Sequence, residues 1–446
     1  MNQAASSSHS TSPVVDGPSA GGQSSRVRSA LYALGALGLL ARVALWWVSE
    51  GSNDIRTWED FGWQVAREGL GRTYRISLFF NHPPLMGLWA GASALMADRF
   101  GLTFAHVFKL PGVLAEVATA LLLVRVVRVR GRADLAPMAF AAYGLALAPI
   151  LITGFHGNTD PLYWFLSLLA TYWLVSKNAP FLAGLAIGAA LNVKLIPLFL
   201  AIALAGLCLD WRRLARYVAG IVLTLLPPML IVATFTHGQR LAFLRHVIGY
   251  RSMPAPWGVE FLVRMAHDGL VGISPGLAHL IRAAGDVYLR IGGPLLIALV
   301  VALVLWQWLD ARRRLDGYAL AALSCVAFLV FASGFGVQYA GTAAALLVVW
   351  SPRKGFISAS LFGVLLAWVY LSYITTWTPI YSEHLEWPAS TACVSFIPWA
   401  YLVWMMWDLI RSAGREGAPL GGKQERGTDR FPVQGGGDAE APPPNE

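Results

Sequence analysis

The chain has 446 residues, 56% of them hydrophobic and only 13% charged, with a formal net charge of +9. Soluble domains carry about 25% charged residues, so this composition excludes a soluble protein of the same size. The positive charge would suit nucleic acid, but the basic residues occupy short loops between apolar blocks, with no basic face interleaved with aromatics. We therefore expect a membrane protein and no nucleic-acid partner.

Apolar blocks near the length that crosses a hydrocarbon core recur from residue 29 to residue 410. They predict an all-α fold, a polytopic transmembrane helix bundle of about 12 spans. Residues 1–27 and 413–446 are rich in Ser, Gly, Pro or charge and are expected to be disordered cytoplasmic tails of a membrane domain over 28–412. The predicted spans are 29–48, 108–127, 135–154, 160–176, 180–193, 194–210, 216–235, 291–309, 317–334, 338–350, 355–374 and 392–410.

Four short basic loops predict the orientation: 125–132, 212–216, 312–314 and 353–354. If all four are cytoplasmic, the outer loops are 49–107, 236–290 and 375–391. The apolar run 85–96 is then too short for a span and is expected to lie on the outer face, with a short true span as the alternative.

The first outer segment begins with Asp54 and continues as an amphipathic stretch with Phe61, Val65 and Leu70 on its apolar side. Desolvation at a membrane boundary can raise the pKa of a carboxyl group and favour proton abstraction. The alternative is that Asp54 only caps a helix or faces water.

Lys194 lies in strongly apolar sequence shortly before Pro197. A charge inside a bilayer is costly, so Lys194 is either a functional cation or a side chain that snorkels to the outer interface. If Lys194 is functional, Lys194→Met is expected to cut activity severely and to leave the amount of folded protein near normal. If Lys194 only snorkels, activity should survive. Glu116, in the second span, could form an ion pair with Lys194 or with Arg42.

The third candidate region is the outer loop that contains Arg245, Arg251 and Trp257. Arginine binds phosphate bidentately and aromatic faces pack on sugars, so this loop is a possible lid. The alternative is an interfacial helix anchored by Trp and Arg. The His and acidic residues lack metal-ligand spacing, so no metal and no other cofactor is expected.

Several elements occur in a recognisable order: Asp54 with its amphipathic segment, His82-Pro83-Pro84-Leu85, Lys109-Leu110-Pro111, Gly157-Asn158-Thr159-Asp160, and Gln338-Tyr339 at the head of a late span. This order over residues 40–350 resembles the GT-C integral-membrane glycosyltransferases that use polyprenyl- or dolichyl-phosphate sugars. The mannosyl- and glucosyltransferase branches fit best, because no large soluble domain follows.

The resemblance implies an inverting hexosyl transfer, with mannose as the first candidate, from a polyprenyl-phosphate donor to a lipid-linked glycan or another lipid or protein acceptor of the cell envelope. Asp54 would be the base and Asp160 the second acid, which orients the acceptor or the base. His82, Gln338 and Tyr339 would line the pocket. Lys194, Arg245 and Arg251 are the candidates for stabilising the departing phosphate. The implied location is a bacterial inner (plasma) membrane with the site on its outer face.

Two other functions remain open at this point. A lipid or sugar transporter or flippase would place charges toward the membrane midplane, with polar groups on both faces, whereas these acids fall mainly in outer loops. A non-catalytic envelope assembly protein would need no acid at a fixed place. An outer cavity shared by Asp54 and Asp160 would favour the enzyme.

Overall fold

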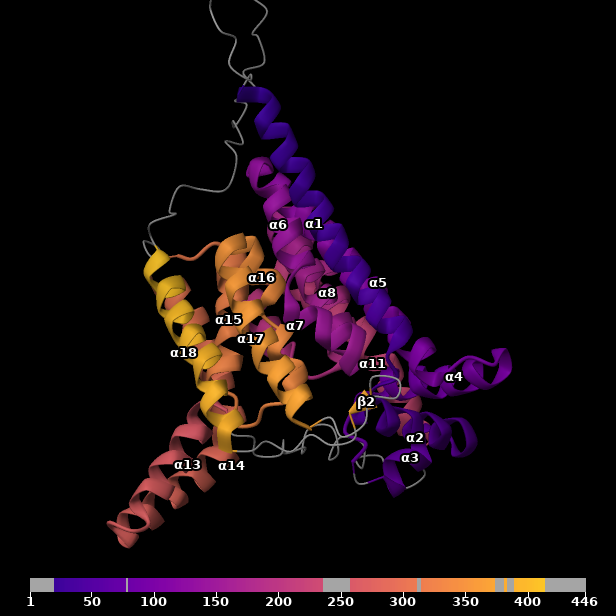
Figure 1. The fold of residues 1–446 in the computed structure, drawn as a ribbon, viewed down its shortest axis with the longest axis vertical. Helices are drawn as coiled ribbons and strands as arrows, with labels where there is room; N and C mark the ends of the chain where they lie inside the picture. Colours follow the sequence, from indigo (N-terminus) through magenta and orange to yellow (C-terminus); the bar gives the residue numbers. More distant parts are fainter. Residues whose placement is uncertain are drawn as a thin grey trace, which may run out of the picture.

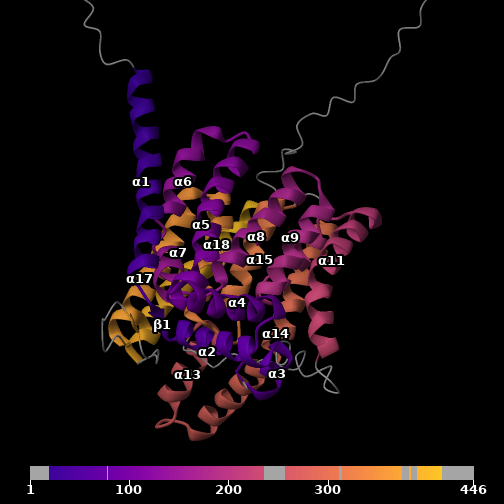
Figure 2. The same cartoon turned by 90° about the vertical axis from the view of Figure 1, so that its right-hand side faces the viewer.

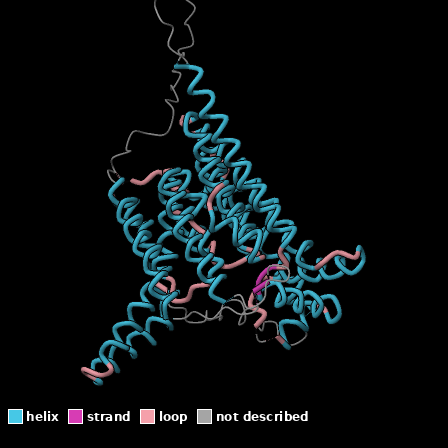
Figure 3. The backbone as a smooth tube through the Cα atoms, viewed as in Figure 1, coloured by secondary structure: helices cyan, strands magenta, loops and turns pink. Residues whose placement is uncertain are grey.

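The computed structural model describes residues 20–77, 79–235, 257–310, 314–373, 381–382 and 389–413, and these are almost entirely helical (Figure 3). Most of the long helices run side by side in a bundle, and shorter elements gather at one of its ends (Figure 1). The strands β1 (Gly51–Ser52) and β2 (Tyr381–Ser382) form a two-residue parallel pair at that end. The predicted all-α class is thereby confirmed for the described part of the chain.

Helix α1 (Ala20–Val48) packs against α6 (Ala136–Gly144) and α5 (Phe104–Val129). It begins inside the segment 1–27 that was expected to be a tail. A Cβ on Gly38 would come within 2.0 Å of the Gly144 carbonyl oxygen, so the α1–α6 crossing requires glycine. The guanidinium of Arg42 bonds this carbonyl and binds Glu116 at 2.9 Å. Glu116 therefore pairs with Arg42, one of its two predicted partners, and this buried pair fastens α1 to α5.

Three short helices form the end of the bundle: α2 (Asn53–Glu68), α3 (Leu70–Ile76) and α4 (Pro84–Phe100). Ser52 caps α2 by accepting a hydrogen bond from the Asp54 amide, as serine favours. Ile55, Trp58, Phe61 and Val65 form its buried stripe, so the predicted amphipathic helix is confirmed. Helix α4 packs on α2 and lies crosswise at the end of the bundle (Figure 2), the direction expected of an interfacial helix.

After the 3-10 turn η1 (Ala133–Leu135) and α6, the chain bends by 49° into α7 (Leu147–Ile150) and the π-helix η2 (Leu151–His156). Gly157 then turns the chain at φ +76° into α8 (Asp160–Thr171), which continues as the π-helix η3 (Tyr172–Ser176). Helix α9 (Pro180–Val193) ends at Lys194, whose backbone is extended, and α10 (Leu198–Ala205) follows Pro197. The break suggested by Pro197 is confirmed, and the predicted span 194–210 contains only this short helix.

The second half contains α11 (Trp211–Phe235), α13 (Gly258–Leu270) and α14 (Pro275–Leu309), then α15 (Gly317–Phe331), the 3-10 turn η5 (Val337–Gly341) and α16 (Ala344–Trp350). Helices α17 (Pro352–Tyr373) and α18 (Ala389–Ser412) complete the bundle. Helix α13 and the start of α14 pack together and project beyond the other helices (Figure 1). The expected outer loop 236–290 is therefore helical in its second part.

Six described helices are long and apolar enough to cross a membrane, or seven if the bent pair 133–156 is one span. The apolar helices over 180–193, 317–331 and 337–350 are shorter. These findings support an integral membrane protein, and about 12 spans remains a prediction.

Contacts join three of the four predicted basic loops. Arg130 forms an ion pair with Asp316 at 2.9 Å, and Arg132 donates to the Trp350 carbonyl at 3.3 Å. The loops around 130, 314 and 353 therefore share one end, as the orientation argument requires. Which side of the membrane this end faces stays a prediction.

Candidate functional site

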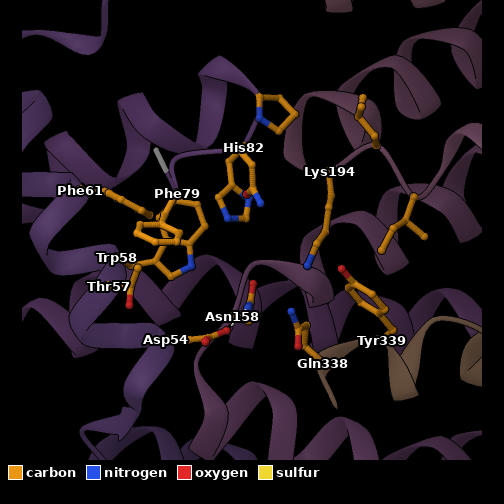
Figure 4. Close-up of a pocket in the computed structure, with 14 residues that line it drawn as sticks. Asp54, Thr57, Trp58, Phe61, Phe79, His82, Asn158, Lys194, Gln338 and Tyr339 are labelled. Atoms are coloured by element: carbon orange, nitrogen blue, oxygen red, sulfur yellow. Dashed lines mark hydrogen bonds between the residues drawn. The ribbon is translucent and has the colours of Figure 1, made fainter. Parts of the chain in front are cut away.

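A cavity of about 290 Å³ opens at the end of the bundle where α2 lies, and it joins segments far apart in the sequence (Figure 4). Five residues predicted from the sequence meet there: Asp54, His82, Lys194, Gln338 and Tyr339. The remaining lining residues are Thr57, Trp58, Phe61, Phe79, Asn81, Pro83, Asn158, Leu195 and Ile196. Residues from four of the sequence elements that suggested a common site therefore line one cavity.

Asp54 lies in the first turn of α2, where the positive end of the helix dipole favours a carboxylate. Its Oδ2 accepts hydrogen bonds from His156 Nε2 at 3.0 Å and Asn158 Nδ2 at 2.6 Å. Burial alone would raise the pKa of this carboxyl, but His156, the Lys194 charge and Asn158 together lower it to about 2. The expectation of a raised pKa was therefore wrong, and Asp54 is anionic at neutral pH.

Lys194 is a buried cation held at the break between α9 and α10. Its Nζ donates to Asp160 Oδ2 at 2.8 Å and lies 4.8 Å from the centre of the Tyr339 ring. Figure 4 shows the ammonium pointing into the space shared with Asn158 and Gln338. Because its charge is paired inside the protein and borders a cavity, the snorkelling alternative does not describe it.

Asp160 lies beside Lys194 and outside the cavity lining, and its expected role of orienting the acceptor or the base stays a prediction. Its side chain has no exposed surface, it is absent from the cavity lining, and Lys194 is its hydrogen-bonded ion partner. It begins α8 just after the turn at Gly157. This carboxylate can fix the position of the Lys194 ammonium, whereas contact with an acceptor hydroxyl would require the site to rearrange.

Aromatic rings form the wall of the cavity nearest α2. The His82 ring lies 4.3 Å from the Trp58 ring, centre to centre, and Tyr74 donates to the His82 carbonyl at 2.6 Å. Burial, and secondarily the Lys194 charge, lower the pKa of His82 to about 3. His82 is therefore a neutral ring at physiological pH. A neutral aromatic wall beside a carboxylate and an ammonium suits a sugar, which has both C–H faces and hydroxyl groups.

Gln338 and Tyr339 reach the cavity from η5, on the side opposite α2. The turn that carries them packs on α8, where Tyr163 and Thr342 share a hydrogen bond of 2.7 Å. A Cβ on Gly341 would fall within 2.2 Å of the Trp164 ring, so the approach of η5 to α8 depends on this glycine. Gln338 and Tyr339 thus line the cavity, and their predicted role in binding the substrate stays a prediction.

His156 and Asn158 are the polar site residues that were missed as ligands or partners of Asp54. Both belong to the loop that also supplies Asp160, so they lay inside a segment already singled out. The hydrogen bond from His156 to Asp54 joins residues 102 positions apart in the chain. No sequence pattern revealed that the loop faces α2.

Arg245 and Arg251 lie outside the described residues, so their predicted phosphate role stays a prediction. Trp257, from the same expected lid, is buried: its Nε1 donates to the Leu329 carbonyl at 2.7 Å and its ring stacks on Phe335 at 4.1 Å. This residue anchors α13 to the bundle. Within the described ranges, no group of three or more His, Cys, Asp or Glu residues could hold a metal ion.

Comparison with known families matches residues 80–334 to the model for Glycosyltransferase family 87. This match covers more than half of the chain and includes His82, Asp160 and Lys194. No curated protein matches the sequence.

Proposed function

From the membership of this chain in glycosyltransferase family 87, a family of membrane-embedded GT-C glycosyltransferases, we propose that it transfers a hexose from a lipid-linked donor to an envelope acceptor. The donor is a hexose, mannose in the first instance, linked to a polyprenyl phosphate. The acceptor is a lipid-linked glycan or another lipid or protein component of a bacterial envelope. The transfer takes place on the outer face of the inner membrane and inverts the anomeric configuration.

The observation that carries this proposal is one cavity with an anionic carboxylate and a buried ammonium. Asp54 takes the proton from the acceptor hydroxyl, and the acceptor oxygen forms a bond to the anomeric carbon. The bond from that carbon to the phosphate oxygen breaks, and its electron pair leaves with the polyprenyl phosphate. Lys194 stabilises the negative charge that develops on this oxygen, while Asp160 holds the ammonium in place.

The cavity walls support a sugar as the transferred group. Trp58 and His82 provide neutral rings, and Asn81, Asn158 and Gln338 provide amide groups that can pair with hydroxyls. Because the polyprenyl tail must stay in lipid, its phosphate needs a cation at a depth near the interface. The position of Lys194 at the end of an apolar helix supports it as this cation.

The experiment is a transfer assay with purified enzyme, in which radiolabelled polyprenyl-phosphate mannose, glucose and aminoarabinose are offered in turn with a lipid extract as acceptor. We expect label to move from one donor, and the Asp54→Asn variant to lose this activity by about 10²-fold or more. Asp286→Asn, an exposed acid of α14 away from the cavity, is the matched control. Transfer from a nucleotide sugar alone, or full activity in Asp54→Asn, would refute the proposal.

A further inference from the structure

His156 is buried directly behind Asp54, with 1% of its surface exposed, and reaches it through one ring nitrogen. It ends the π-helix η2, and such segments often occur at functional sites. Its ring stacks on Tyr370 of α17, with centres 5.8 Å apart and planes inclined by 24°. The imidazole is therefore held on two sides, which fixes the direction of its bond to Asp54.

The backbones of these two residues are also tied together. Ser52, which is fully buried, accepts from the Asp54 amide and donates to the His156 carbonyl at 3.0 Å. One hydroxyl thus joins the start of α2 to the end of η2. The separation of Asp54 and His156 is consequently set by the main chain as well as by the side chains.

Both hydrogen bonds to the carboxylate end on the same oxygen. His156 and Asn158 donate to Oδ2 of Asp54, and Asp54 itself lines the cavity. The other oxygen, Oδ1, is thereby left for the acceptor hydroxyl. A carboxylate held by one oxygen cannot rotate freely, so the lone pairs of Oδ1 keep a constant direction.

The second ring nitrogen of His156, Nδ1, is buried and has no hydrogen-bond partner among the described residues. The bond from Nε2 to Asp54 is therefore the one hydrogen bond that the ring makes within the described part of the chain.

We propose that His156 is a positioning residue for the transfer: through its Nε2–H donor it locks Oδ2 of Asp54 and directs Oδ1 at the acceptor. This inference rests on the proposed function, because it assigns Asp54 as the base. The charged and titratable groups around the pair are Lys194 from the end of α9, His82 from the segment before α4, Asp160 from α8, Tyr370 from α17 and Lys109 from α5, whose ammonium donates to the Gly154 carbonyl of η2.

Two substitutions separate a positioning role from a structural one. His156→Phe keeps a planar ring against Tyr370 and removes the donor, whereas His156→Gln supplies an amide N–H near the position of Nε2. We expect His156→Phe to lose about 10²-fold in kcat. Its acid limb should move to higher pH, because Asp54 loses the charge interaction and the hydrogen bond with His156, both of which lower its pKa. His156→Gln should keep a kcat within about tenfold of wild type, because its amide N–H can still hold Oδ2 of Asp54.

The assay records kcat and KM against pH for both variants, with His106→Phe as the control. His106 is a hydrogen-bonded histidine of α5 that does not line the cavity, and its loss should leave the pH profile unchanged. Equal losses in His156→Phe and His156→Gln, or an unmoved acid limb in His156→Phe, would overturn the inference. Full activity in Asp54→Asn would instead remove the proposed function on which it rests.

Discussion

Removal of the Lys194 charge tests the role of the buried ion pair between Lys194 and Asp160. Its ion pair with Asp160 has 11% of the lysine side chain exposed and none of the aspartate. In Lys194→Met the carboxylate keeps its burial and loses its partner, which costs about 3–5 kcal/mol of stability for pairs of this kind. Normal folding of this single variant, expected from the sequence, is therefore no longer the prediction.

The double variant Lys194→Met/Asp160→Asn separates stability from catalysis. It leaves no unpaired buried charge, so we expect it to regain about 2 kcal/mol or more relative to the sum of the two single losses. If Lys194 stabilises the departing phosphate, transfer should remain reduced by about 10²–10³-fold in the recovered protein.

The assay combines thermal unfolding of the purified proteins in detergent with transfer rates normalised to folded protein. The single variants should melt well below wild type and the double variant between them and wild type. A double variant that is both stable and fully active would refute the phosphate role. If the stability loss of the double variant equals the sum of the losses of the two single variants, the energetic coupling of the ion pair is refuted.

Three further outcomes follow from the structure. Folding lowers the pKa of His82 to about 3, so below pH 6.5 the unfolded chain binds a proton that the folded chain does not, and the free energy of unfolding should fall by at most about 2 kcal/mol at pH 5. The difference in melting temperature between wild type and His82→Asn should therefore change between pH 7.5 and pH 5. A constant difference would contradict a neutral His82. Tyr339→Phe keeps the aromatic ring beside Lys194 and should retain activity within about threefold. Tyr339→Leu loses a cation–π contact of about 1 kcal/mol, so its kcat/KM should fall about fivefold. Equal activity of the two variants would argue against that contact. Gly144→Leu would place a side chain against Gly35 of α1 and should abolish folded protein in membranes. The control is Gly272→Ala, whose Cβ would meet no atom within 4 Å. Normal membrane levels of Gly144→Leu would show that α1 and α6 can separate.

The membrane class, the helical fold and several cavity residues followed from local sequence. Apolar blocks of span length predict helices because backbone groups in lipid must be satisfied within the segment. Pro197 predicts a break because proline cannot continue a helix, and the chain does break between α9 and α10. The stripe of Phe61 and Val65 predicts an amphipathic α2 because its spacing follows the helical period.

Tertiary structure decided the pairing and ionisation of the site residues. Glu116 had two possible partners, and only the packing of α1 on α5 selected Arg42. Asp54 was expected to have a raised pKa, but His156, Asn158 and Lys194 reverse the effect of burial from distant positions in the chain. Such contacts depend on how helices cross, and no local pattern encodes a crossing between residues 102 positions apart. The sequence by itself therefore determined which chemical groups the membrane helices carry, and the three-dimensional packing decided which of them act together.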